Sequence, residues 1–314
     1  MEYRNLGRSG LIVSAVGMGC NNFGGRADPE MSARVIHKAI DVGITLFDTA
    51  DIYAGYGMSE RVMGEVLGDR RKDIVLATKF SGPMDDTGRL AGASRRYIMS
   101  AVEASLTRLK TDWIDLYQLH FPDSLTPIEE TLRALDDLVR QGKVRYIGCS
   151  NLSAWRVVEA LWTSKALNLE SFVLVQEEYS LVVRDIERDM VPMAEAYGLG
   201  LLPYFPLASG LLTGKYKPGK PAPRGTRFDS TPRLADRYRT DRNVALVKTF
   251  ASIARKHDLT LLDLAFGWLL ARPQVSSVIA GATKPEQVEQ NVAAASRPVG
   301  PEAIAAVDEA FAAA

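Results

Sequence analysis

Eight short apolar runs alternate with segments of helical periodicity along the chain, and this alternation limits its fold more than any other feature. Several runs, such as IVLAT and FVLVQ, are almost continuously apolar, which is typical of parallel strands covered on both faces. We expect strands near residues 15–18, 44–48, 74–79, 114–120, 144–149, 172–176, 199–204 and 275–280. We expect helices near residues 29–42, 58–69, 94–109, 127–141, 153–165, 185–197 and 241–271, the last in one piece or two, and further helices that begin near residues 285 and 301.

A strand followed by a helix, repeated eight times, implies parallel strands joined by right-handed crossovers. Such units close most naturally into a (β/α)8 TIM barrel, which routinely exceeds 250 residues as one domain. We therefore expect an α/β fold with one barrel domain over residues 1–314, preceded by a β-hairpin that turns at Gly10 and followed by an extra C-terminal helix. An open doubly wound sheet is the alternative, but no glycine-rich dinucleotide fingerprint follows the first strand.

Composition excludes several classes of function. The 38 Lys and Arg residues balance 38 Asp and Glu residues, whereas a general nucleic-acid binder needs a basic excess. Two cysteines and three histidines leave little material for a zinc site. No run approaches the roughly 20 apolar residues of a membrane span, and the N-terminus lacks the apolar stretch of a signal peptide. We expect a cytoplasmic protein with no metal and with no nucleic-acid or membrane partner; the sequence is compatible with a monomer or an oligomer.

The barrel hypothesis predicts where functional residues lie, because barrel enzymes carry their active sites at the C-terminal ends of the strands. Those ends hold Asp48, Lys79, His120, Ser150 with Asn151, Gln176, Tyr204 and Gly281. The first three residues are separated by 31 and 41 positions, and each interval matches one βαβ unit. Tyr53 follows Asp48 by five positions, in a loop that contains glycines. We expect Asp48, Tyr53, Lys79 and His120 to converge at the barrel mouth.

These four side chains suit the protonation of an oxygen on which negative charge develops. Asp48 stabilises Lys79 as an ammonium, and the ammonium should lower the pKa of the Tyr53 phenol below its usual value of about 10. His120 can hydrogen-bond a substrate oxygen and hold it against the phenol. Carbonyl reduction therefore fits if a hydride source lies nearby, whereas acyl transfer lacks a nucleophile aligned with a base. Taken singly, the same residues have structural explanations, such as an ordinary buried ion pair between Asp48 and Lys79.

Six segments together resemble the aldo-keto reductase superfamily. They are FDTADIYAGYGMSE (47–60), IVLATKF (74–80), RLKTDWIDLYQLH (108–120), GKVRYIGCSN (142–151), YFPLASGLLTGKY (204–216) and VIAGATKPEQVEQN (278–291). The resemblance extends from about residue 3 to residue 295 and is greatest to the bacterial branches related to the potassium-channel β-subunit family.

The resemblance implies a catalytic tetrad of Asp48, Tyr53, Lys79 and His120, with Tyr53 as the proton donor. It also implies that Ser150, Asn151 and Gln176 hydrogen-bond the nicotinamide carboxamide and that Tyr204 stacks on the nicotinamide ring. The full set of implied cofactor contacts is Gly19, Cys20, Asn21, Asp48, Ser150, Asn151, Gln176, Tyr204, Phe205, Pro206, Leu207, Ser209, Gly210, Lys215, Gly281, Thr283, Lys284, Gln287, Gln290 and Asn291.

The segment after the last strand bears on which cofactor is used. Thr283 suits a helix N-cap, Pro285 suits the first turn, and Lys284 lies beside the resulting anion-binding helix terminus. A 2′-phosphate fits such a terminus, so the segment favours NADP(H), with NAD(H) as the alternative. Gln287 stands where the aldose-reductase branch has a basic residue, so one phosphate contact is missing.

Two further expectations concern the barrel mouth. Residues 215–242 carry nine Lys or Arg residues against three Asp residues and show the least regular pattern, and we hypothesise that this stretch becomes ordered when a cofactor binds. The aromatic side chains of Phe23, Tyr56, Phe80 and Phe121 are expected at the substrate pocket, which suits apolar or aromatic carbonyl compounds.

The leading hypothesis is therefore an NADP(H)-dependent aldo-keto reductase that interconverts small-molecule carbonyl compounds and alcohols. A cofactor-sensing regulatory subunit with very slow turnover is the alternative that the channel-related resemblance allows, although we expect no added N-terminal segment of the kind that acts on a channel. A metal-dependent barrel hydrolase would need several ligands at the mouth, where only Asp48 and His120 qualify.

Overall fold

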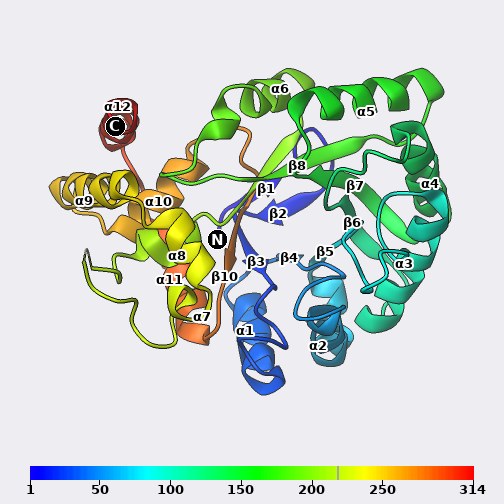
Figure 1. Ribbon diagram of the computed structural model, residues 1–314, viewed down its shortest axis with the longest axis horizontal. Helices are drawn as coiled ribbons and strands as arrows, with labels where there is room; N and C mark the ends of the chain where they lie inside the picture. The colour runs from blue at the N-terminus through cyan, green and yellow to red at the C-terminus, as the bar shows by residue number, and fades with distance from the viewer. Residues whose placement is uncertain (218) are drawn as a thin grey trace.

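The computed structural model describes residues 1–217 and 219–314 and confirms the barrel prediction. Eight parallel strands are hydrogen-bonded in the order β10-β3-β4-β5-β6-β7-β8-β9, and the helices surround them (Figure 1). The strands are β3 (Val16–Gly19), β4 (Leu46–Asp48), β5 (Val75–Phe80), β6 (Ile114–Leu119), β7 (Val144–Ser150), β8 (Phe172–Glu178), β9 (Gly200–Tyr204) and β10 (Val278–Gly281). The ring closes through Leu201 of β9, whose backbone N–H donates to the carbonyl of Gln274 at 2.7 Å and whose carbonyl accepts from Ser276 at 3.0 Å.

The predicted N-terminal hairpin is present and covers the N-terminal end of the barrel. Its strands β1 (Tyr3–Asn5) and β2 (Ile12–Ser14) pair antiparallel. Leu6 and Val13 of this hairpin form one buried cluster with residues inside the barrel, including Leu46, Leu116 and Leu174. The opposite end of the barrel, where the strands terminate, is open to a ligand.

The helices follow the predicted periodicity with a few differences. They are α1 (Pro29–Asp41), α2 (Met58–Leu67), α3 (Arg95–Leu109), α4 (Ile128–Arg140), α5 (Ala154–Leu167), α6 (Met190–Tyr197), α7 (Arg227–Ser230), α8 (Pro232–Tyr238), α9 (Asp241–Lys256), α10 (Leu261–Leu270), α11 (Pro285–Ala295) and α12 (Pro301–Ala312). The helix expected at 241–271 is two helices, because Thr260 and Asp263 form a capping box that begins a new one. The helix expected at 185–197 begins at Met190, after a 3-10 turn.

The basic stretch at 215–242 is more regular than its sequence indicates. It contains α7 and α8, and α8 has Pro232 in its first turn, a position that suits proline. Pro218, within the same stretch, lies outside the described residues. Among the described helices, none combines the length and the apolar character that crossing a membrane requires.

Side-chain alternation along β8 determines which residues face the interior. Leu174 belongs to the cluster inside the barrel, whereas Val175 packs in the outer core between the sheet and the helices. By the same alternation Gln176 points inward, and its amide reaches Asp48. Its neighbour Glu177 points outward.

Candidate functional site

A buried ion pair lies where the C-terminal ends of β4 and β5 meet. The Lys79 Nζ atom donates to Asp48 Oδ2 at 2.6 Å and to the carbonyl oxygen of Thr49 at 2.9 Å. Lys79 is completely buried, and Asp48 is 3% exposed. Two strands further round the barrel complete the environment of Asp48, because Gln118 of β6 and Gln176 of β8 both donate to its Oδ1 atom. Asp48, which holds the Lys79 ammonium, is therefore itself held by side chains of β5, β6 and β8.

Tyr53 lies over this ion pair, as the sequence predicts. Its hydroxyl oxygen is 3.4 Å from Lys79 Nζ. The loop that returns Tyr53 to the mouth takes left-handed backbone conformations at Ala54, where φ is 57°, and at Tyr56, where φ is 52°. The His120 ring is edge-on to the Tyr53 ring at a centroid distance of 5.8 Å. The structure thus brings all four predicted residues together.

The protonation states of the three titrating groups follow from burial and from the Lys79 charge. Burial acts to lower the pKa of Lys79, but Asp48 and Tyr53 outweigh it, so the net pKa is raised and the ammonium persists. Burial raises the pKa of Tyr53 by more than Lys79 lowers it. The expectation of a phenol pKa below 10 is therefore wrong. Burial and the Lys79 charge lower the pKa of His120 to about 2, so its imidazole is neutral.

A cavity of about 940 Å³ opens over Tyr53 and His120 and continues along the strand ends. All the residues predicted to contact a cofactor line this cavity, from Gly19 on β3 to Asn291 on α11. Lys79 lies behind its wall. The lining residues that the sequence prediction did not place in the site are Asn22, Arg26, Ile52, Thr213, Arg224, Gly225, Thr226, Arg227, Arg233, Leu262, Ile279 and Ala280.

Positive charge is concentrated in the cavity wall. Its described residues include Arg26, Lys215, Arg224, Arg227, Arg233 and Lys284, against a single acidic residue, Asp48, that is already paired. Burial and the nearby Arg26 lower the pKa values of both Lys215 and Arg227. The Arg227 Nε atom is buried without a hydrogen-bond partner among the described residues. A bound anion would relieve this repulsion and supply the missing acceptor. The arginines of the 215–242 stretch were visible as a basic run, but the sequence offered no signal for Arg26.

The turn after β7 forms hydrogen bonds to residues at the ends of two other strands. Asn151 has a left-handed backbone with φ of 60°. Its Nδ2 atom donates to the carbonyl oxygen of His120 at 3.0 Å, and its Oδ1 atom accepts from the Tyr204 hydroxyl at 2.8 Å. Asn151 therefore connects the end of β6 with the end of β9.

The N-terminus of α11 differs from its predicted form. Lys284, not Thr283, occupies the N-cap position, and Pro285 is the first helical residue. The Gln287 Oε1 atom accepts from the backbone N–H of Thr283 at 2.7 Å. Gln287 is the third residue of α11, and its side chain thus accepts a hydrogen bond from the backbone that precedes the helix. The third residue of a capping box acts in the same way. Lys284 remains as the positive side chain at this end of the cavity.

Of the four aromatic side chains expected at the substrate pocket, Phe121 lines the cavity. The others lie elsewhere: Phe23 and Phe80 are fully buried in the core, and Tyr56 is half exposed, with its hydroxyl bonded to Asp86. The sequence pattern did not distinguish these positions, because an aromatic residue near a strand end can face either the core or the mouth. Among the described residues, no group of three or more His, Cys, Asp or Glu side chains is arranged to hold a metal ion.

Comparison with known proteins agrees with this geometry. Residues 15–312 match the model of the Aldo/keto reductase family. A protein of Oryza sativa subsp. japonica named "Probable voltage-gated potassium channel subunit beta" is 38% identical over 305 residues, covering 94% of this chain and 91% of that protein. A Bacillus subtilis protein named "Uncharacterized oxidoreductase YrpG" is 36% identical over 304 residues, with the same coverage of 94% and 91%. The chain described here belongs to the aldo/keto reductase family.

Proposed function

We propose that this protein is an NADP(H)-dependent oxidoreductase that reduces aldehydes and ketones to alcohols, or catalyses the reverse reaction, with Tyr53 as the general acid. Membership of the family makes it an oxidoreductase. The observation that carries the finer proposal is the Tyr53 hydroxyl, which lies 3.4 Å from a buried ammonium and beside a neutral imidazole in the wall of a large cavity.

The residues fit the proposed reaction as follows. Bound nicotinamide supplies the hydride that the carbonyl carbon accepts. Tyr53 donates its proton to the carbonyl oxygen as negative charge develops there, and the Lys79 ammonium stabilises the phenolate that remains. The raised pKa of Tyr53 keeps the phenol protonated at neutral pH, so the donor is ready before reaction. The neutral His120 can donate a hydrogen bond to the same oxygen.

The cavity fits a dinucleotide cofactor along its length. Gln176 and Asn151 line the same cavity as Tyr53 with their amides, which suits a carboxamide, and Lys215 and Arg227 line it with positive charge, which suits a diphosphate. At the far end, Lys284 lies at the N-terminus of α11, which favours an anion such as a 2′-phosphate.

A substrate panel with the two cofactors in parallel tests the proposed function. We expect the protein to oxidise NADPH in the presence of aromatic and aliphatic aldehydes, with a higher kcat/KM for NADPH than for NADH. Loss of absorbance by the reduced nicotinamide measures both. Absence of turnover with either cofactor across the panel would reject the proposal.

The relatives named as channel subunits favour a second candidate, a cofactor-binding subunit with very slow turnover. The same panel separates the two functions. Tight NADPH binding with turnover at or below about one per minute for every carbonyl compound would support the second candidate, because typical enzymes turn over about 10 times per second.

The cofactor preference makes a separate prediction for Lys284. Replacing this exposed residue with Ala should weaken NADPH binding by about fivefold and leave NADH binding unchanged, because only NADPH carries the extra phosphate with which we propose that the ammonium pairs. Quenching of protein fluorescence measures both affinities. Lys256→Ala, an exposed change at the end of α9, is the matched control and should alter neither. An equal loss of affinity for both cofactors in Lys284→Ala would contradict the assignment.

A further inference from the structure

The loop that carries Tyr53 leads into a buried ion pair outside the barrel wall. Glu60, in the first turn of α2, is fully buried, and its Oε2 atom accepts from Arg108 Nε at 2.6 Å. Arg108 comes from the last turn of α3, and only 10% of its side chain is exposed. Removing two charges from water is costly, and apolar side chains of similar size often stabilise a protein as well as such a pair does. The presence of the pair therefore calls for an explanation other than stability.

Glu60 connects this ion pair to the strand that carries Lys79. The Thr78 hydroxyl donates to Glu60 Oε1 at 2.5 Å, and Thr78 directly precedes Lys79 on β5. Neighbouring side chains of a strand point to opposite faces, so Lys79 points into the barrel while Thr78 points out toward α2. Both carboxylate oxygens of Glu60 are thus used, one toward β5 and the other toward α3.

Arg108 also restricts the end of the Tyr53 loop. Gly57, the N-cap of α2, has a left-handed backbone with φ of 91°. A Cβ atom at this position would lie 2.5 Å from Arg108 Nε, so the arginine side chain packs directly against the backbone. Two residues later, the backbone N–H of Ser59 donates to the Tyr53 carbonyl at 3.4 Å, and the Ser59 hydroxyl donates to the Cys20 carbonyl at 2.8 Å. The start of α2 is therefore held from α3, from the end of β3 and from the loop itself.

We propose that Glu60 and Arg108 are positioning residues for proton transfer, whose ion pair holds the start of α2 against β5 and so keeps the Tyr53 hydroxyl beside the Lys79 ammonium. Neither Glu60 nor Arg108 lines the cofactor cavity, so both act through the Tyr53 loop, with no contact to the cofactor or the substrate. The inference rests on the proposed function, since it requires Tyr53 to be the general acid.

This role predicts that turnover and cofactor affinity respond differently. The distance of 3.4 Å between the Tyr53 hydroxyl and Lys79 Nζ is already longer than a typical hydrogen bond, so a small movement of the loop would break the contact. Misplacement of a reacting group by about 1 Å can lower a rate by about 10²-fold. Most residues that line the cofactor cavity lie on other strand ends and loops, so NADPH affinity should change little.

The test replaces the whole cluster with apolar side chains of similar size, in the variant Glu60→Leu/Thr78→Val/Arg108→Met. We expect kcat for an aldehyde to fall about 10–10²-fold, while the Kd for NADPH stays within about twofold of the wild type. The solvent deuterium isotope effect on kcat should increase, because transfer of the Tyr53 proton becomes the slow step. Urea denaturation should show nearly wild-type stability, because this variant leaves neither charge of the pair buried without its partner.

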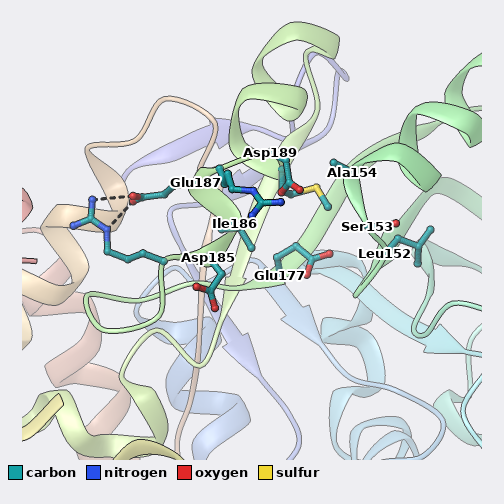
Figure 2. Close-up of a pocket in the computed structure, with 11 residues that line it drawn as sticks. Leu152, Ser153, Ala154, Glu177, Asp185, Ile186, Glu187 and Asp189 are labelled. Carbon is teal, nitrogen blue, oxygen red and sulfur yellow. Dashed lines mark hydrogen bonds and ion pairs between the residues drawn. The ribbon is translucent and has the colours of Figure 1, made fainter. Parts of the chain in front are cut away.

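The ion pair between Arg184 and Glu187 provides the matched control (Figure 2). Its two hydrogen bonds are both 2.9 Å long and the Arg184 side chain is 9% exposed, but the pair borders a separate cavity of about 710 Å³ between the start of α5 and residues 184–190. Arg184→Met/Glu187→Gln removes this pair and keeps an acceptor for the Tyr179 hydroxyl, which donates to Glu187. The control should retain the wild-type kcat and isotope effect.

Thr78→Val alone decides the question if the triple variant does not fold. It removes one hydrogen bond to Glu60 and keeps the ion pair, so kcat should fall about threefold with an unchanged Kd for NADPH. Wild-type kcat in the folded triple variant, or in Thr78→Val where the triple variant does not fold, overturns the inference. So does an NADPH affinity that falls as much as kcat, an unchanged isotope effect, or an equal loss of turnover in the control. A wild-type protein that reduces no carbonyl compound would instead overturn the proposed function, and this inference with it.

Discussion

Replacing Tyr53 with Phe is expected to lower kcat for carbonyl reduction by about 10²–10⁴-fold, the range that a positioned general acid contributes. The change removes the hydroxyl that lies 3.4 Å from Lys79 Nζ and that we propose as the proton donor. Affinity for NADPH should stay within about twofold of the wild type, because the ring itself is retained. Steady-state turnover of an aldehyde and fluorescence titration with NADPH measure the two effects.

Tyr56→Phe is the matched control for this variant. Tyr56 lies in the same loop, and its hydroxyl bonds to Asp86 at the surface, outside the cavity. This control should retain wild-type turnover. If Tyr53→Phe reduces an aldehyde at the wild-type rate, Tyr53 is not the proton donor, whereas equal losses in both variants would indicate a general disturbance of the loop.

Replacing Lys79 with Met should have the second-largest effect, on stability as well as on turnover. Lys79 is fully buried and its Nζ atom lies 2.6 Å from Asp48, so the variant leaves a carboxylate without its counter-charge inside the barrel. Removing one partner of a buried ion pair typically costs about 3–5 kcal/mol. Urea denaturation should show this loss as a lower free energy of unfolding, and turnover should fall because no ammonium stabilises the Tyr53 phenolate.

The double variant Asp48→Asn/Lys79→Met separates these two consequences. An Asn at position 48 is neutral, and its Oδ1 atom can still accept from Gln118 and Gln176. We expect the double variant to recover most of the lost stability but none of the turnover. Recovery of turnover would show that the Lys79 charge is not needed for proton transfer.

The arrangement of the mouth is the part of the site that could be predicted from sequence. Asp48, Lys79 and His120 lie one βαβ unit apart, and parallel strands in a barrel place their C-terminal ends on one rim. Residues far apart in the chain, such as Gly19 and Asn291, consequently line one cavity. The family resemblance added the role expected of each of these residues and the cofactor contacts expected in the loops, such as Leu207 and Gln290.

Properties that depend on the burial and orientation of side chains could not be predicted from strand spacing and family resemblance. The pKa of Tyr53 is raised because desolvation outweighs the neighbouring charge, and a sequence records the neighbour but not the loss of water. Phe23 and Phe80 turned out to be core residues. The N-cap residue of α11 is Lys284, one position after the predicted Thr283, and the backbone N–H of Thr283 donates to Gln287.

The sequence by itself determined the number and order of the strands, the rim on which they end and the residue types found there, because these follow from periodicity and spacing along the chain. Only the tertiary structure decided how the groups titrate and which aromatic side chains face the cavity. The physical reason is that desolvation and hydrogen bonding between strands depend on every neighbour in space, most of which are distant in the chain.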